Sequence, residues 1–338
     1  MKNGITRFNY HLDQLQALLT KAEKQKNPGL WLYQNNARTP LFMLEALAKM
    51  YTCLHNKKKF CKLKEHFKLL EDILGAVDYY DCFAKEFAGN TNIPANVTGY
   101  LQAQAREKIQ SLNEALKENE WLGVEKNRIA KMKKKLGEMD WQKSSAEIKS
   151  IRKFYISAIT EIIAFTGKTN CQFTNVEADV HELRRKLRWL SIYPQALRGA
   201  IQLSSSKLKN GQPKTPVKAL EKYLTPEITN SPFNKMPDAG DNTAFLLLEQ
   251  NYFYALSWMI AQLGKLKDSG LRLVSIREAL QQLSAIGEAD ALNKAKEFIG
   301  GDQPDLQQVL AKADGICKTY FKEQNLQKLI IGTATTIS

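Results

Sequence analysis

The sequence predicts an all-α protein, and three observations carry this prediction. Apolar residues recur at helical spacing in nearly every periodic segment of the 338-residue chain. Runs in which β-branched residues alternate with polar ones, the usual sign of a strand, are absent. Helix start signals are frequent, since Thr39-Pro40 and Asp241-Asn242-Thr243 each offer a capping oxygen and Pro40 suits a first helical position.

The expected helices follow from this periodicity and from the caps between segments. In chain order they cover residues 5–25, 40–55, 58–88, 93–119, 121–137, 143–166, 176–203, 216–224, 243–267, 271–286, 288–299 and 304–325. The longest irregular stretches, 204–215 and 226–241, are rich in Ser, Pro, Asn and Gly. They are expected to be surface loops around one short helix.

Composition narrows the class of protein and of partner. The chain is 43% hydrophobic, which is ample for a large core, and its net charge of +14 favours polyanions such as nucleic acid, anionic membrane or polyphosphate. The five cysteines are scattered without a CxxC pair, which argues against a zinc site or a disulfide framework. No signal-peptide core or membrane-spanning stretch stands out, so we expect a cytoplasmic protein without a membrane partner.

The segment from His181 to Leu190 carries the clearest functional signal. On a helix turning by about 100° per residue, it separates into an apolar and a basic face. The apolar face holds Leu183, Leu187 and Leu190, and the opposite face holds His181, Arg184, Arg185 and Arg188. Arg forks grip phosphate oxygens in pairs, and His adds a donor that gains charge near neutral pH. The plainer interpretation is an amphipathic helix with a solvated basic face.

The chain also divides into two weakly similar halves. Arg38 precedes a helix that is followed by Leu74-Gly75 and, further on, Asp81; Arg184 lies in a helix that is followed by Leu263-Gly264 and Asp268. We therefore expect a first helical half over 1–166, a second over 176–325 with a loop-rich insertion at 204–241, and a C-terminal tail over 326–338. The two glycines are expected to permit close helix–helix approach, and the aspartates to cap a helix or orient an arginine.

These motifs resemble the conserved histidine α-helical domain (CHAD) family. Its pattern His-x-x-Arg-x-x-x-Arg/Lys, followed by Leu-Gly-x-x-x-Asp, matches His181, Arg184, Arg188, Leu263-Gly264 and Asp268. The first copy is degraded: Asn35 stands in place of His, Arg38 is kept, and Pro40, Phe42 and Met43 replace small and basic residues.

The resemblance implies two four-helix-bundle-like halves related by a pseudo-twofold, with basic helices lining a central groove. It also implies a module that binds inorganic polyphosphate or a similar phosphate-rich polyanion, with a triphosphate- or polyphosphate-processing enzyme as a partner. Polyphosphate granules are then a place where such a cytoplasmic protein can be found. The expected contacts are His181, Arg184, Arg185 and Arg188, joined by Arg38, Lys64 and Lys68 from the first half.

Three other functions are weighed against this one. A nucleic-acid binder would use the same positive surface, and a degenerate helical adaptor would have kept the fold and lost the ligand. An enzyme acting on phosphate polymers is disfavoured, because neither a catalytic constellation nor a carboxylate set for a metal is found in the sequence. The expectation is therefore a non-catalytic protein without cofactor or metal.

Overall fold

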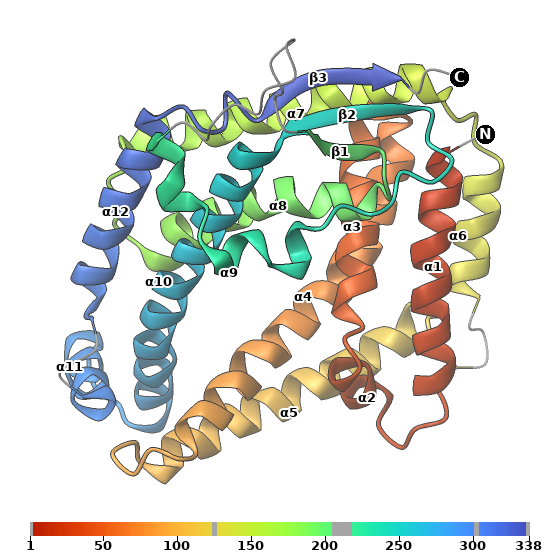
Figure 1. Cartoon of the computed structure of the whole chain (residues 1–338). Helices are drawn as coiled ribbons and strands as arrows, with labels where there is room; N and C mark the ends of the chain where they lie inside the picture. Colours follow the sequence, from red (N-terminus) through yellow and green to blue (C-terminus); the bar gives the residue numbers. More distant parts are fainter. Residues whose placement is uncertain (1–2, 124–126, 205–217, 301–303, 336–338) are drawn as a thin grey trace.

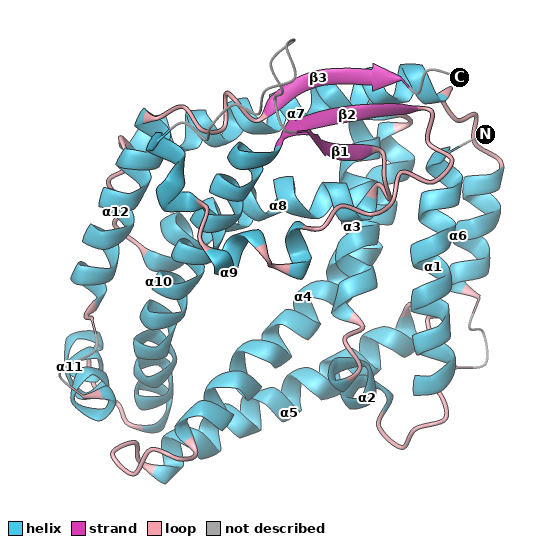
Figure 2. Ribbon diagram, viewed as in Figure 1, coloured by secondary structure: helices cyan, strands magenta, loops and turns pink. Residues whose placement is uncertain are grey.

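The structure, a computed structural model, describes residues 3–123, 127–204, 218–300 and 304–335 and is mostly helical, in agreement with the predicted class (Figures 1 and 2). The elements up to residue 169 are helices only. They are α1 (Asn3–Ala22), α2 (Pro28–Gln34), α3 (Arg38–Leu54), α4 (Lys57–Phe87), α5 (Ala95–Glu118), α6 (Arg128–Gly137) and α7 (Ser144–Thr169). Of these, α2 is the helix that the sequence analysis missed.

The rest of the chain mixes helices with a small sheet. The helical elements are a π-helix η1 (Val176–His181), α8 (Glu182–Ala196), 3-10 turns η2 (Lys218–Tyr223) and η3 (Pro232–Asn234), α9 (Pro226–Thr229), α10 (Gln250–Leu283), α11 (Glu288–Ile299) and α12 (Leu306–Lys322). Two helices predicted over 243–267 and 271–286 are a single helix, α10. Of the predicted loops, residues 205–215 lie outside the described residues.

A small three-stranded sheet, which the sequence analysis did not predict, accompanies the helices. Its strands are β1 (Ile201–Ser204), β2 (Ala244–Glu249) and β3 (Ile330–Thr335), with β2 in the middle, parallel to β1 and antiparallel to β3. The sequence analysis placed β1 and β2 at helix ends and assigned β3 to a tail. Asn242 was predicted to offer a capping oxygen, but its side chain binds two other residues. Its Oδ1 accepts a hydrogen bond from Arg7 Nη2, and its Nδ2 donates to the carbonyl of Arg198.

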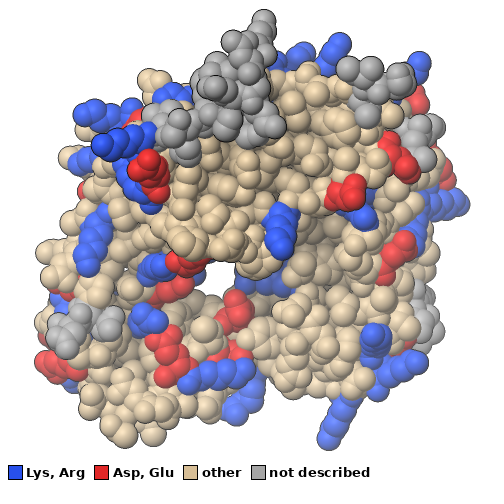
Figure 3. Space-filling model, viewed as in Figure 1, with Lys and Arg blue, Asp and Glu red and all other residues tan. Residues whose placement is uncertain are grey.

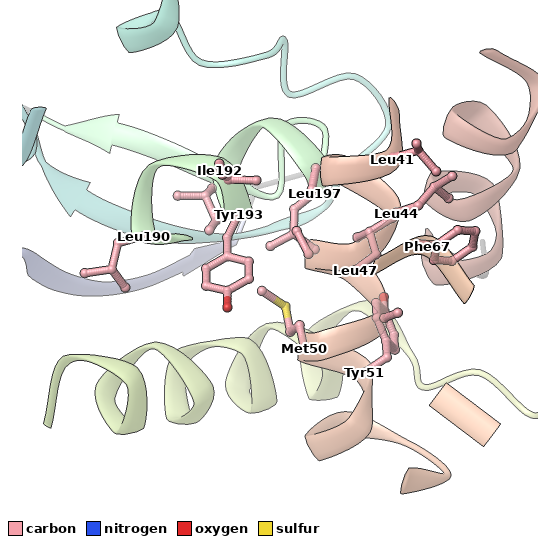
Figure 4. Packing of buried hydrophobic residues seen from close by; sticks show 14 of the residues in the cluster. Leu41, Leu44, Leu47, Met50, Tyr51, Phe67, Leu190, Ile192, Tyr193 and Leu197 are labelled. Carbon is pink, nitrogen blue, oxygen red and sulfur yellow. The ribbon is translucent and has the colours of Figure 1, made fainter. Parts of the chain in front are cut away.

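One hydrophobic core runs through both predicted halves and fixes α3 against α8. Figure 4 shows Leu44, Leu47 and Met50 of α3 facing Leu190 and Tyr193 of α8. All five are 0–1% exposed, and burial of each such side chain contributes about 1.5–3 kcal/mol. The core therefore holds the N-terminal turns of α3 and α8, which carry Arg38 and Arg184, in a fixed relation.

A second, smaller core joins the ends of the long helices. It contains Phe83, Phe87, Val97 and Leu101 of α4 and α5 together with residues of α10 and α11 such as Ile276 and Ala291. Between the two cores, Figure 3 shows an opening through the molecule, bordered by α4 and α10 in the view of Figure 1, which we call the central opening. Side chains of both charges surround it. Among the described helices, none is both long and apolar enough to cross a membrane.

Candidate anion-binding site

The site begins where Arg38, the first residue of α3, lies against α4. A Cβ built on Gly75 of α4 would stand 2.7 Å from Nη2 of Arg38, so the guanidinium occupies the space that a side chain there would need. Arg38 Nε donates to Glu71 Oε1 at 2.7 Å, and its Nη1 donates to Asp78 Oδ2 at 3.1 Å. Glu71 is 7% exposed, so Arg38 is the counter-charge of a buried carboxylate.

The same arrangement recurs between α8 and α10. A Cβ on Gly264 of α10 would stand 3.0 Å from Nε of Arg184, and this Nε donates to the carbonyl of Ile260 at 3.3 Å. Each glycine of the two Leu-Gly segments thus accommodates an arginine side chain. The expected close approach of two helices at these glycines is replaced by the approach of an arginine to a helix backbone.

Arg188 lies one turn after Arg184 and faces the first half. Its Cζ is 4.7 Å from the centre of the Phe42 ring, and Cζ of Arg38 is 5.1 Å from the same centre. Phe42 follows Arg38 by four residues, as Arg188 follows Arg184. The ring therefore contacts both guanidiniums, each within the range of a cation–π attraction. Phe42, interpreted from the sequence as a degraded position, is a packing partner of Arg188.

The charges at this cluster of Arg38, Arg184 and Arg188 are not balanced. Arg38 has two carboxylate partners, but no described carboxylate lies within ion-pair distance of Arg184 or Arg188. Burial lowers the pKa of Arg184, and the charge of Asp268 opposes this effect. Burial, followed by repulsion from Arg184 and Arg38, lowers the pKa of Arg188 to about 10, and the more distant charges of Glu71 and Asp78 oppose this effect. Two half-buried cations, neither in an ion pair with a described carboxylate, are an arrangement that a bound anion would stabilise.

His181 and Arg185 are directed to neighbours on their own helical segment. His181 Nδ1 lies 2.7 Å from Glu177 Oε1, and Arg185 Nη2 lies 2.6 Å from Glu182 Oε2. The sequence analysis assumed a regular α-helix through His181, but this residue ends the π-helix η1, whose wider turn changes the angular positions before Glu182. The structure thus brings Arg184 and Arg188 together with Arg38, and does not add His181 or Arg185 to them.

The two predicted lysines differ in their contacts. Lys68 Nζ donates to both carboxylate oxygens of Asp72, at 2.5 and 2.6 Å, whereas Lys64 is half-buried on α4 and forms no ion pair with a described residue. The aspartates of the Leu-Gly segments do not orient Arg184 by direct contact. Asp81 accepts from the Tyr33 hydroxyl and from Lys85, and Asp268 pairs with Lys267 at 2.7 Å.

The aromatic rings at this site are in contact with cationic or aromatic side chains of the protein itself. Besides the two guanidiniums at Phe42, Lys49 Nζ lies 5.0 Å from the Trp189 ring centre, and Tyr193 stacks on Trp189 with centroids 5.9 Å apart. The ring centroids of Trp189 and Phe42 are 6.1 Å apart, in an edge-to-face arrangement. The rings thus hold the cations in place and offer a nucleobase little free surface for stacking.

Neither a metal site nor a second anion site competes with the cluster in the part of the chain that the structure describes. Within the described residues, no three His, Cys, Asp or Glu side chains are grouped so that they could hold a metal ion. A cavity of about 600 Å³ lies away from the cluster, between α2 and the end of α5, and its charged lining consists of Glu23, Glu118, Glu120 and Lys117. This cavity is more acidic than basic and does not suit an anion.

A scan against models of known protein families finds no match for the chain, and a search of curated protein sequences finds none either. The function proposed below accordingly starts from the residues of the cluster.

Proposed function

We propose that the protein is a non-catalytic binding module for inorganic polyphosphate or a similar phosphate-rich polyanion. The observation that carries this proposal is the pair Arg184 and Arg188, two half-buried guanidiniums without a carboxylate partner among the described residues. An arginine fork suits tetrahedral phosphate oxygens, and a bound phosphate would supply the missing counter-charge.

The central opening supports a chain-like ligand. It is bordered by α4 and α10, the helices whose glycines Gly75 and Gly264 contact Arg38 of α3 and Arg184 of α8. We infer that the cluster faces this opening and that a linear phosphate polymer passes along it. Affinity would then come from several phosphates and the release of their counter-ions, with no single contact needing to be strong.

The aromatic contacts favour phosphate over nucleic acid. Single-stranded nucleic acid is held in large part by stacking of bases on exposed aromatic faces. At this site Phe42 and Trp189 are covered by arginine, lysine and tyrosine side chains. Phosphate groups remain the part of a polymer that the cluster is equipped to bind.

The repeated Arg–Gly contact supports the inferred duplication. Arg38 on Gly75 and Arg184 on Gly264 give the same contact in two halves, 1–166 and 176–325, whose arginine helices pack side by side. We infer from this that the halves are related by a pseudo-twofold, as the resemblance to the CHAD family implies. In this proposal the second half supplies the free cations, while Arg38 is held by Glu71 and Asp78.

A calorimetric titration with long-chain polyphosphate at near-physiological salt, competed with duplex DNA of matched charge, tests the proposal. Saturable binding that DNA displaces poorly is the expected result, together with a steep fall in affinity as salt rises. Equal or better competition by DNA would assign the surface to nucleic acid, and absence of binding to both would leave a helical scaffold without this ligand.

A matched pair of variants connects the binding to the cluster. Arg188→Met removes one free cation, and Arg152→Met removes an exposed arginine of α7 that has no ion pair with a described residue. Only Arg188→Met should weaken polyphosphate binding, by about tenfold, and equal affinities for the two variants would contradict the assigned site.

A further inference from the structure

The face of α3 that carries Arg38 extends beyond the arginine cluster and carries further charged residues. Arg38, Phe42, Glu45 and Lys49 follow one another at spacings of four, three and four residues, which places all of them on one face of the helix. Lys49 lies about 16 Å from Arg38 along the axis, at 1.5 Å per residue. Lys49 belongs to neither sequence motif and is not among the contacts predicted from the sequence.

Lys49 is a half-buried cation without an ion pair among the described residues. Its Nζ lies over the Trp189 ring, and the same Trp189 touches Phe42, so an aromatic bridge joins Lys49 to the arginine cluster. Burial lowers the pKa of Lys49; the charges of Glu45 and of Glu161 on α7 act against this, and the nearby cations Lys186 and Arg185 of α8 lower it further. Lys49 thus lies near two further cations where α3 meets α8, and of the three only Lys49 lacks an ion pair with a described residue, because Arg185 and Lys186 both pair with Glu182.

Glu45, one turn before Lys49, is the carboxyl group closest in sequence, but it does not act as a full counter-ion. It is 6% exposed and receives no hydrogen bond from a described residue. The charged groups that face it are Lys49 on its own helix and Glu71, Lys68 and Asp72 on α4. Burial, followed by the negative charge of Glu71, raises the pKa of Glu45 to about 7, so near neutral pH it is ionised only in part.

We propose that the anion site continues from Arg188 across Phe42 and Trp189 to Lys49, which forms a second subsite for phosphate. This inference rests on the proposed function and deepens it, because it names a contact and gives the bound chain a direction along α3. Arg184 and Arg188 hold one part of the chain, and Lys49, with Lys186 beside it, holds another. A ligand too short to reach both groups gains nothing from Lys49.

The test compares two ligands and two matched variants. Lys49→Met keeps the length of the side chain over Trp189 and removes its charge, and Lys153→Met does the same at an exposed lysine of α7 without an ion pair to a described residue. We expect Lys49→Met to weaken binding of long-chain polyphosphate at least about fivefold and binding of tripolyphosphate less than about twofold. Lys49→Arg should restore the long-chain affinity, and thermal melts confirm that each variant is folded.

The outcomes separate the two proposals. If the unaltered protein binds neither ligand, the proposed function fails. If it binds both ligands and Lys49→Met matches Lys153→Met with long-chain polyphosphate, the site exists but does not extend to Lys49. An equal loss for both ligands also contradicts a second subsite, because it would place Lys49 at the first one.

Discussion

The guanidinium of Arg184 takes the place of a side chain on Gly264: its Nε is 3.0 Å from the position of a Cβ there. The contact of Arg38 with Gly75 is closer still, at 2.7 Å. Gly inside a helix lowers helix stability by about 1 kcal/mol relative to Ala. Both long helices are therefore less stable at these positions, where an arginine side chain lies against their backbone. This relation explains the Leu-Gly motif by the position of an arginine.

Substituting Gly264 by Ala separates helix stability from anion binding. The methyl group would push Arg184 by a few tenths of an ångström, while the helix gains up to about 1 kcal/mol. We expect Gly264→Ala to leave the free energy of unfolding unchanged or slightly higher and to weaken polyphosphate binding about three- to tenfold. Urea denaturation and calorimetry measure the two effects, and Gly167→Ala, at a helical position with no atom near the added Cβ, is the control.

Replacing Arg38 and replacing Arg188 should have different effects on the free energy of unfolding. Arg38→Met leaves Glu71 buried without its partner and should lower the free energy of unfolding by about 1–3 kcal/mol. Arg188→Met removes a cation that has no ion pair with a described carboxylate and is repelled by two others; the loss of its contact with Phe42 is partly replaced by the Met side chain, so stability should change by less than about 1 kcal/mol. Denaturant melts of both variants check this contrast, and a larger loss of stability for Arg188→Met would show that Arg188 is a structural residue.

The sequence predicts which residues of the cluster share a face of one helix. It does not predict which residues come together when helices distant in the sequence pack against each other. Arg184 and Arg188 could be paired from their spacing alone. Their meeting with Arg38 depends on the packing of α3 on α8, which the resemblance suggested and the periodicity of either helix cannot give. His181 was placed with them on the assumption of an unbroken α-helix, whereas the segment Val176–His181, capped by Asn175, is a π-helix.

The same distinction applies to the fold. Most helices were predicted to within a few residues, and α11 agrees with its predicted range. Residues 244–249 form a short apolar run without diagnostic periodicity, directly before the helical pattern of α10, and were assigned to the helix. Their partner Ile330–Thr335 lies far along the chain, so only the pairing itself reveals both strands.

Removal of the C-terminal strand tests whether the last residues are a tail. A chain that ends at Leu329 would lose the antiparallel ladder from Ala244–Thr335 to Leu248–Ile330 and expose that edge of β2. At about 0.5–1.5 kcal/mol for each net hydrogen bond, we expect a loss of at least about 2 kcal/mol in the free energy of unfolding. Urea denaturation of the shortened chain measures this loss, and unchanged stability would support a tail without a structural role.

Glu45 should make the stability of the protein depend on pH near neutrality. Its pKa in the folded protein is raised from 4.5 to about 7, so between these values the folded state holds a proton that the unfolded state releases. Stability from this group is therefore complete below pH 4.5 and is lost as pH rises through about 7. Glu45→Gln mimics the protonated form and should raise the free energy of unfolding at pH 8 by about 2–3 kcal/mol, with little change at pH 5.

Denaturant melts between pH 5 and pH 8, with Glu65→Gln as the exposed control, measure this difference. Equal pH profiles for the unaltered protein and Glu45→Gln would show that Glu45 is ionised in the folded state at ordinary pH, and that Lys49 has a full counter-ion beneath it.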